Sequence, residues 1–191
     1  MLNLCQDLIK KDLSALRVLE IGPGKNPILN KKDFSETFFI DKEFQYEGPN
    51  KINKNFLDFK SDLKFDLIFE RLCWHEQNKN NWNNFLDNVI SHLSPNGLFI
   101  SEHAIGHKEM AFEEDSLHYD EETMQLWDLS RDIILRFIPS SNFIENILIE
   151  KKLNIKFFKI PFGKKVIFER NNSQTKSTDP DLLQLIAQKP L

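Results

Sequence analysis

The sequence predicts an α/β protein built on a doubly wound, mostly parallel β-sheet. Short apolar runs, each long enough for one buried strand, alternate with stretches whose apolar residues recur at helical spacing. Several runs stop at a glycine or an acidic residue, as strands do where a turn follows. The 191 residues, 40% of them hydrophobic and 28% charged, suit one globular domain with a sizeable core.

The first half of the chain is expected to hold one helix and four strands. Apolar residues at helical spacing predict a leading amphipathic helix over residues 2–13. Apolar runs predict strands at 16–21, at 37–41, within 51–59 and at 64–72. Only brief polar stretches separate the first three strands, so we expect shortened helices after the first two.

The second half is expected to alternate helices with a fifth strand. A helix over 79–93, with its apolar side chains on one face, precedes a strand at 98–103. A long helix is predicted from 121 to 138, because Asp120 is placed as its N-cap and acidic residues fill its first turn. Another helix is predicted over about 142–152.

The end of the chain is expected to form a hairpin, a linker and a helix. Strands at 154–160 and 164–170 flank "PFG", which favours a tight turn, so the last strand should be antiparallel. After a polar linker, "DPDLLQLIA" offers an Asp N-cap and a proline at the first helical position. We therefore expect an N-terminal helix at 1–14, the main domain at 15–170, and a linker with a short helix at 171–191.

Composition limits the kinds of partner. A formal net charge of −4 provides no basic field for nucleic acid, which is therefore an unlikely partner. No segment is apolar enough to cross a membrane, and the N-terminus does not resemble a signal peptide, so a cytoplasmic protein is expected. Cys5 and Cys73 lie far apart and are interpreted as small buried hydrophobes.

The residues that follow the strands are the candidates for function, because ligands of such sheets bind beyond the carboxyl ends of the strands. The first strand leads into Glu20-Ile21-Gly22-Pro23-Gly24, whose glycines let backbone approach a ligand closely. Asp41 follows the second strand, where a carboxylate can accept hydrogen bonds from ribose hydroxyls. Later strands are followed by "NFLDF", by "ERLCWHE", and by Glu102 with His103.

Two nucleotide interpretations compete for the glycine turn. A dinucleotide turn needs Gly-x-Gly-x-x-Gly, but "GPGKNP" has Pro27 at the third position, and Glu20 would repel a pyrophosphate. S-adenosylmethionine carries an ammonium and a sulfonium group and no phosphate. An acid beside the turn favours such a cationic ligand.

At these positions the sequence resembles the class I S-adenosylmethionine-dependent methyltransferases. Five blocks between about residues 15 and 104 follow the order of the family: "VLEIGPGKNP", "FFIDKE", "NFLDF", "FDLIFERLCWHE" and "LSPNGLFISEH". Two departures are clear: the first two connections are short, and Asn26 stands where the family's first motif has its third glycine. The resemblance implies a Rossmann-like sheet of about seven strands whose last strand is antiparallel.

The resemblance also implies S-adenosyl-L-methionine as the cofactor and assigns candidate site residues. The cofactor-binding candidates are Glu20, Gly22, Pro23, Gly24, Asp41, Asp58, Phe59, Arg71 and Leu72. Trp74 and Glu102 are candidates for the acceptor side, and His75 and His103 are candidates for a general base. Phe59 has core packing as its alternative, and His75 has a hydrogen bond that ties its loop to the next helix.

The predicted function is methyl transfer from S-adenosylmethionine to a small-molecule acceptor. A protein or RNA methyltransferase is one alternative, and a non-catalytic module that binds the cofactor is another. No metal is expected: His103 and His107, with Glu113, Glu114 and His118, have some metal-like spacing, but Gly106 indicates a loop there.

Overall fold

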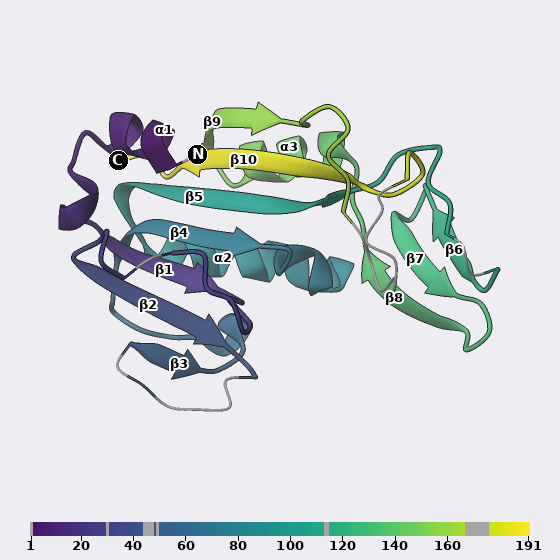
Figure 1. Cartoon of the computed structure of the whole chain (residues 1–191), viewed down its shortest axis with the longest axis horizontal. Helices are drawn as coiled ribbons and strands as arrows, with labels where there is room; N and C mark the ends of the chain where they lie inside the picture. The colour runs from purple at the N-terminus through teal and green to yellow at the C-terminus, as the bar shows by residue number, and fades with distance from the viewer. Residues whose placement is uncertain (1, 30, 44–47, 49, 113–114, 167–175) are drawn as a thin grey trace.

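The computed structural model of the chain describes residues 2–29, 31–43, 48, 50–112, 115–166 and 176–191. Its centre is a seven-stranded sheet in the order β3-β2-β1-β4-β5-β10-β9 (Figure 1). The strands are β1 Arg17–Ile21, β2 Glu36–Asp41, β3 Lys51–Asn53, β4 Phe65–Arg71, β5 Leu93–Ile105, β9 Asn154–Lys159 and β10 Asp181–Gln188.

Strand directions agree with the predicted doubly wound sheet. β3, β2, β1, β4 and β5 run parallel to one another, and β10 is antiparallel to both of its neighbours. The connections between β1 and β2 and between β2 and β3 are short, as predicted, but their described residues contain no helix where shortened helices were expected. The carboxyl ends of β1, β2, β4 and β5 consequently meet at one edge of the sheet.

Helices cover both faces of the sheet. α1, Leu2–Ile9, packs on one face through a cluster that includes the fully buried Cys5. α2, Trp82–His92, and α3, Ser141–Glu150, pack on the opposite face, as Figure 1 shows. Apolar side chains on one stripe of each helix account for this layering, because each stripe has to leave water.

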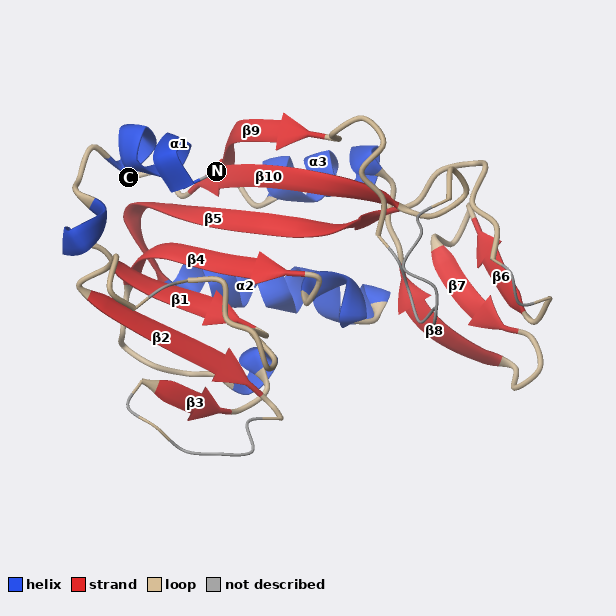
Figure 2. Ribbon diagram, viewed as in Figure 1, coloured by secondary structure: helices blue, strands red, loops and turns tan. Residues whose placement is uncertain are grey.

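The predicted long helix over 121–138 is wrong. The chain there forms a small antiparallel sheet, separate from the main one, made of β6 Leu117–Asp120, β7 Gln125–Asp128 and β8 Ile133–Phe137 (Figure 2). Asp120 caps a turn instead of a helix, since its Oδ1 accepts from the backbone N–H groups of Glu122 and Thr123 at 2.9 and 3.2 Å. Met124 and Asp132, with φ of 57° and 54°, turn the chain between the strands.

The predicted C-terminal helix is also wrong. Residues 181–188 form β10, which lies between β5 and β9 and buries Leu183, Leu185, Ile186 and Ala187. Burial of this segment on both faces of the sheet therefore outweighs the helix-capping residues in its sequence.

The predicted hairpin between 154–160 and 164–170 is wrong in its pairing. β9 forms as expected, but its antiparallel partner is β10. Lys165 makes only an isolated bridge to Asp181, and residues 167–170 lie outside the described residues.

Candidate functional site

A cavity of about 380 Å³ opens at the carboxyl ends of the central strands. It is bounded by the glycine turn after β1, the segment after β2, the 3-10 turn Phe56–Asp58 and the loop after β4. Its lining residues are Ile21, Gly22, Ile40, Asp41, Lys42, Glu43, Lys54, Asn55, Phe56, Leu72, Cys73, Glu76, Gln77 and Phe85. Three of the predicted site residues, Gly22, Asp41 and Leu72, are among them.

The glycine turn is fixed by its backbone and by close packing. Gly22 has φ of +64°, and its N–H donates to the Ile40 carbonyl at 2.8 Å. A Cβ at this position would lie 2.8 Å from the Cys73 Sγ, which is too close for any side chain. Gly24 also has a positive φ, +55°, but faces open space. Pro23, between them, is buried and is not among the lining residues.

Asp41 joins the loops that follow β1 and β2. Its Oδ2 accepts from the Gly24 N–H at 3.0 Å, and its Oδ1 accepts from the Glu43 N–H at 2.9 Å. The side chain is half-buried and lines the cavity, and each carboxylate oxygen has a further lone pair with which it can accept from a ligand. The carboxylate is thus held in place before any ligand arrives.

Glu20 anchors the segment that follows the turn. The side chain is 2% exposed and accepts from the backbone N–H groups of Ile28 and Leu29, each at 2.9 Å. Burial raises the pKa of this carboxyl, and the two backbone hydrogen bonds oppose that rise. Its direct contacts are therefore with the protein's own backbone.

The loop after β4 forms another wall of the cavity. Leu72 has φ of 56°, and its N–H donates to the Glu102 carbonyl at 2.7 Å. Cys73, Glu76 and Gln77 follow it along the wall, whereas Arg71 is exposed and does not line the cavity. An ion pair with Arg136 of β8 joins Glu76 to the small sheet.

Glu70, absent from the sequence-based candidates, holds this loop. Its carboxylate is fully buried and accepts from the backbone N–H groups of Cys73 and Trp74, both at 3.0 Å, and from the Ser101 hydroxyl. Burial disfavours its charge, yet these hydrogen bonds and the neighbouring His103 hold the pKa below its ordinary value. A charged residue inside the apolar run "FDLIFER" was the available signal, since a buried carboxylate needs partners.

Both candidate bases are buried, and neither lines the cavity. His103 is fully buried, and its Nδ1 lies 2.6 Å from the Ser101 Oγ. His75 is 1% exposed, and burial lowers its pKa to about 4. Burial likewise lowers the pKa of His103, so both imidazoles are neutral near pH 7.

The two candidates for the acceptor side, Trp74 and Glu102, also contact other side chains of the protein and not the cavity. Trp74 is fully buried and stacks on Trp82 with ring centroids 4.2 Å apart. Glu102 accepts from the Gln184 side chain of β10 at 2.7 Å. Neither residue is among those that line the cavity.

The segment after β3 presents different residues from those expected. Asp58 is exposed and borders a separate hollow beside α2, and Phe59 is buried and stacks on His92 with centroids 4.7 Å apart. Asn55 and Phe56 line the cavity instead. The 3-10 turn, capped by the Asn55 side chain on the Leu57 N–H at 3.0 Å, shifts the register of this segment.

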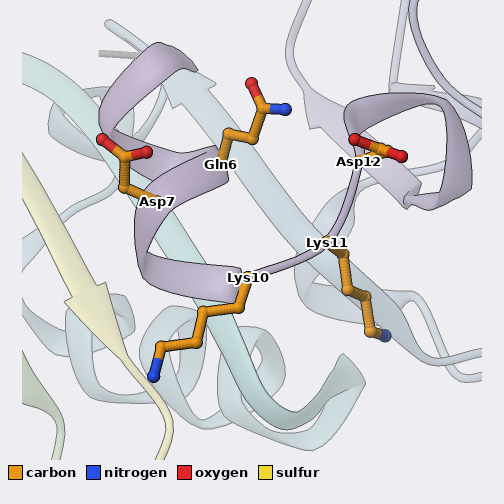
Figure 3. A pocket seen from close by; sticks show the side chains of 5 residues that line it. All are labelled: Gln6, Asp7, Lys10, Lys11 and Asp12. Carbon is orange, nitrogen blue, oxygen red and sulfur yellow. The ribbon is translucent and has the colours of Figure 1, made fainter.

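The described part of the chain has other hollows besides this cavity. A shallow polar hollow of about 400 Å³ lies at the end of α1, lined by Gln6, Asp7, Lys10, Lys11 and Asp12, as Figure 3 shows.

Within the described ranges no group of three His, Cys, Asp or Glu side chains is placed to hold a metal, and Glu113 and Glu114 lie outside those ranges. No helix in the described part of the chain is long and apolar enough to cross a membrane.

Comparisons with known proteins agree on the fold. The N-methyltransferase NodS from Bradyrhizobium japonicum WM9, solved with S-adenosyl-L-homocysteine, aligns with a TM-score of 0.60 and 17% identity over 99% of this chain and 87% of its own. The Burkholderia thailandensis 1,6-didemethyltoxoflavin-N1-methyltransferase, solved with 1,6-didemethyltoxoflavin and S-adenosylhomocysteine, aligns with a TM-score of 0.63 and 12% identity over 99% of this chain and 76% of its own.

A third structure, an S-adenosylmethionine-dependent methyltransferase from Mesorhizobium loti, gives a TM-score of 0.60 and 14% identity over 97% of this chain and 98% of its own. No protein-family model and no curated protein matches the sequence. Strand order, strand direction and these structural neighbours lead to one conclusion: the chain has the fold of the class I S-adenosylmethionine-dependent methyltransferases.

Proposed function

We propose that the protein binds S-adenosylmethionine in the cavity at the carboxyl ends of β1, β2 and β4 and transfers its methyl group to a small-molecule acceptor. The observation that carries the proposal is Asp41, a preorganised carboxylate on the wall of a cavity of about 380 Å³. That volume lies within the range of small-molecule sites, roughly 300–1,000 Å³.

The residues at the cavity fit such a cofactor. Asp41 would accept hydrogen bonds from the ribose hydroxyls, and Phe56 and Phe85 offer apolar surface for the adenine ring. The acidic side chains of Glu43 and Glu76 also line the cavity, where Glu43 pairs with Lys42 at 3.8 Å and Glu76 pairs with Arg136, so much of their charge is balanced within the protein. Gly22 also lines the cavity and exposes bare backbone there, because a Cβ would meet the Cys73 Sγ at 2.8 Å.

The cofactor would supply an activated methyl group on a sulfonium. The protein's part in such a displacement is to place the acceptor in line and to exclude water. His75 and His103 are buried and neutral. In this structure they therefore contribute to the packing and hydrogen bonding around the loop after β4. An acceptor that is already deprotonated, or that loses its proton to water, suits this arrangement best.

Calorimetry with S-adenosylmethionine, S-adenosylhomocysteine and NAD tests the cofactor. We expect both sulfur nucleosides to bind and NAD to fail. Asp41→Ala should weaken binding at least tenfold, which is the loss of a charge-assisted hydrogen-bonding group. Asp62→Ala, which removes an exposed carboxylate remote from the cavity, is the matched control and should leave affinity unchanged. Binding of NAD alone would contradict the proposal.

Turnover then separates the enzyme from its alternatives. Formation of S-adenosylhomocysteine with small amines, hydroxyl compounds and thiols would identify the acceptor class. Turnover only with protein or RNA would support the macromolecular alternative, and cofactor binding without turnover would support a binding module. Asp58→Ala tests separately whether Asp58 contacts the cofactor, as the resemblance implies, since unchanged affinity would leave that contact to Asn55 and Phe56.

A further inference from the structure

Residues 151–165 concentrate positive charge on a chain whose formal net charge is −4. This stretch, "KKLNIKFFKIPFGKK", contains six lysines and no acidic residue. Two of the lysines pair with described acids, Lys151 with Asp87 and Lys165 with Asp181, each at 2.7 Å. The other four are exposed: Lys152, Lys156, Lys159 and Lys164.

An apolar tip projects from the same stretch. The Lys164 N–H donates to the Pro161 carbonyl at 3.1 Å and closes a turn in which Gly163 has φ of +68°. Phe162 occupies the corner of this turn and is fully exposed, and Ile160 beside it is 42% exposed. The turn requires glycine at its third position but does not require an aromatic residue at its corner. We call Ile160–Phe162 with Lys156, Lys159 and Lys164 the basic tip.

The basic tip lies at the rim of the main sheet. β9 is the outermost strand, at the opposite edge from β3, and β5 and β10 separate it from the strands β1, β2 and β4 that carry the cavity (Figure 1). Lysines on an edge strand also prevent pairing with other chains, which accounts for part of the charge. Edge protection does not account for Phe162 and Ile160, because exposed apolar side chains favour association.

We propose that the basic tip docks the protein on a bilayer surface that contains anionic lipids. The lysines match the charge of the headgroups, and Phe162 with Ile160 would enter the interfacial layer between them. Single-stranded RNA also offers phosphates and could stack a base on Phe162, but it would leave Ile160 in water. The combination of cationic and aliphatic side chains therefore favours the bilayer. This docking is independent of the proposed methyl transfer, because the cavity lies on other strands.

Vesicle co-sedimentation of the full chain tests the proposal. We expect binding to vesicles of phosphatidylcholine with 30% phosphatidylglycerol, no binding to phosphatidylcholine alone, and loss of binding at high salt. Lys159→Gln should weaken binding about fivefold, which corresponds to about 1 kcal/mol per lysine at an anionic surface. Phe162→Ser should weaken it at least tenfold. With Phe162→Trp, the tryptophan emission should shift to shorter wavelength when anionic vesicles are added.

Matched controls lie elsewhere on the surface. Leu129→Ser removes another exposed apolar side chain, on the turn after β7, and Lys108→Gln removes another exposed lysine. Both should leave vesicle binding unchanged, and cofactor affinity should be unchanged in every variant. No binding to anionic vesicles, or equal binding by Phe162→Ser, would overturn the proposal. Tight binding of a single-stranded RNA without vesicle binding would replace the bilayer with nucleic acid.

Discussion

Removal of the Glu70 carboxylate should be among the most damaging single changes near the cavity. Glu70 is fully buried, and its carboxylate accepts from two backbone N–H groups and from the Ser101 hydroxyl. In Glu70→Ala the N–H groups of Cys73 and Trp74 lose their acceptor, at about 1–3 kcal/mol each. We expect a loss of about 3–5 kcal/mol, the range for removing one partner of a buried charged network.

Glu70→Gln separates the charge from the hydrogen bonds. The amide oxygen can still accept from both backbone N–H groups, so we expect a loss of only about 1–2 kcal/mol. Glu102→Ala, which removes a half-buried carboxylate with one side-chain partner, is the control and should cost about 1 kcal/mol. Urea unfolding with an unchanged m-value measures all three differences.

The pH dependence gives the same reasoning a second test. Because the pKa of Glu70 is held below its ordinary value, its stabilisation is present above the unfolded-state pKa, about 4.3, and is lost only as pH falls through the lower folded-state value. The difference between wild type and Glu70→Gln should therefore be constant near pH 7 and shrink below about pH 4.3. Equal losses in Glu70→Ala and Glu70→Gln would refute the role given to the two backbone N–H groups.

Two further predictions concern the same region. Gly22→Ala should destabilise by about 2–5 kcal/mol and Gly24→Ala by only about 1–2 kcal/mol, because both have positive φ but only Gly22 meets a neighbour, the Cys73 Sγ at 2.8 Å; equal losses in urea unfolding would contradict the packing argument. His75 has a folded-state pKa of about 4, so the unfolded chain binds the extra proton between about pH 6.5 and 4, and stability should fall by about 3 kcal/mol as pH drops through that window. His75→Asn should remove that part of the pH dependence, and an unchanged slope would place His75 in a more solvated setting.

The sequence was sufficient for the part of the fold whose elements carry local signals. β1, β2 and β4 are apolar runs, and the first two end at a glycine or an acid, so their positions and the edge that gathers Gly22 and Asp41 could be predicted. β10 could not be predicted, because its capping residues favour a helix and only the place between β5 and β9 decides for a strand. The turns at Met124 and Asp132 could not be predicted either, because both residues adopt a positive φ and neither position is a glycine.

Within the site, the limit was the direction of side chains near each strand end. Phe59 and Phe56 are three residues apart, and a 3-10 turn places Phe59 against His92 and Phe56 at the cavity. His75 and His103 follow strands as expected but point into the packed interior. Periodicity predicts which segment reaches the edge of the sheet, whereas the exact turn decides which of its side chains faces the cavity.

The placement of β10 between β5 and β9 also determines when these strands can pair during synthesis. β5 pairs along one side with β4, and its other side is covered only when residues up to Gln188 have left the ribosome, since Leu98 pairs with Gln188. Until then, a long apolar strand presents unpaired backbone groups and β9 has no partner among the described strands. The part of the sheet formed by β5, β10 and β9 can therefore assemble only after the last strand, β10, has been synthesised. Its assembly should be slower than that of the part formed by β1 to β4, and more dependent on chaperones.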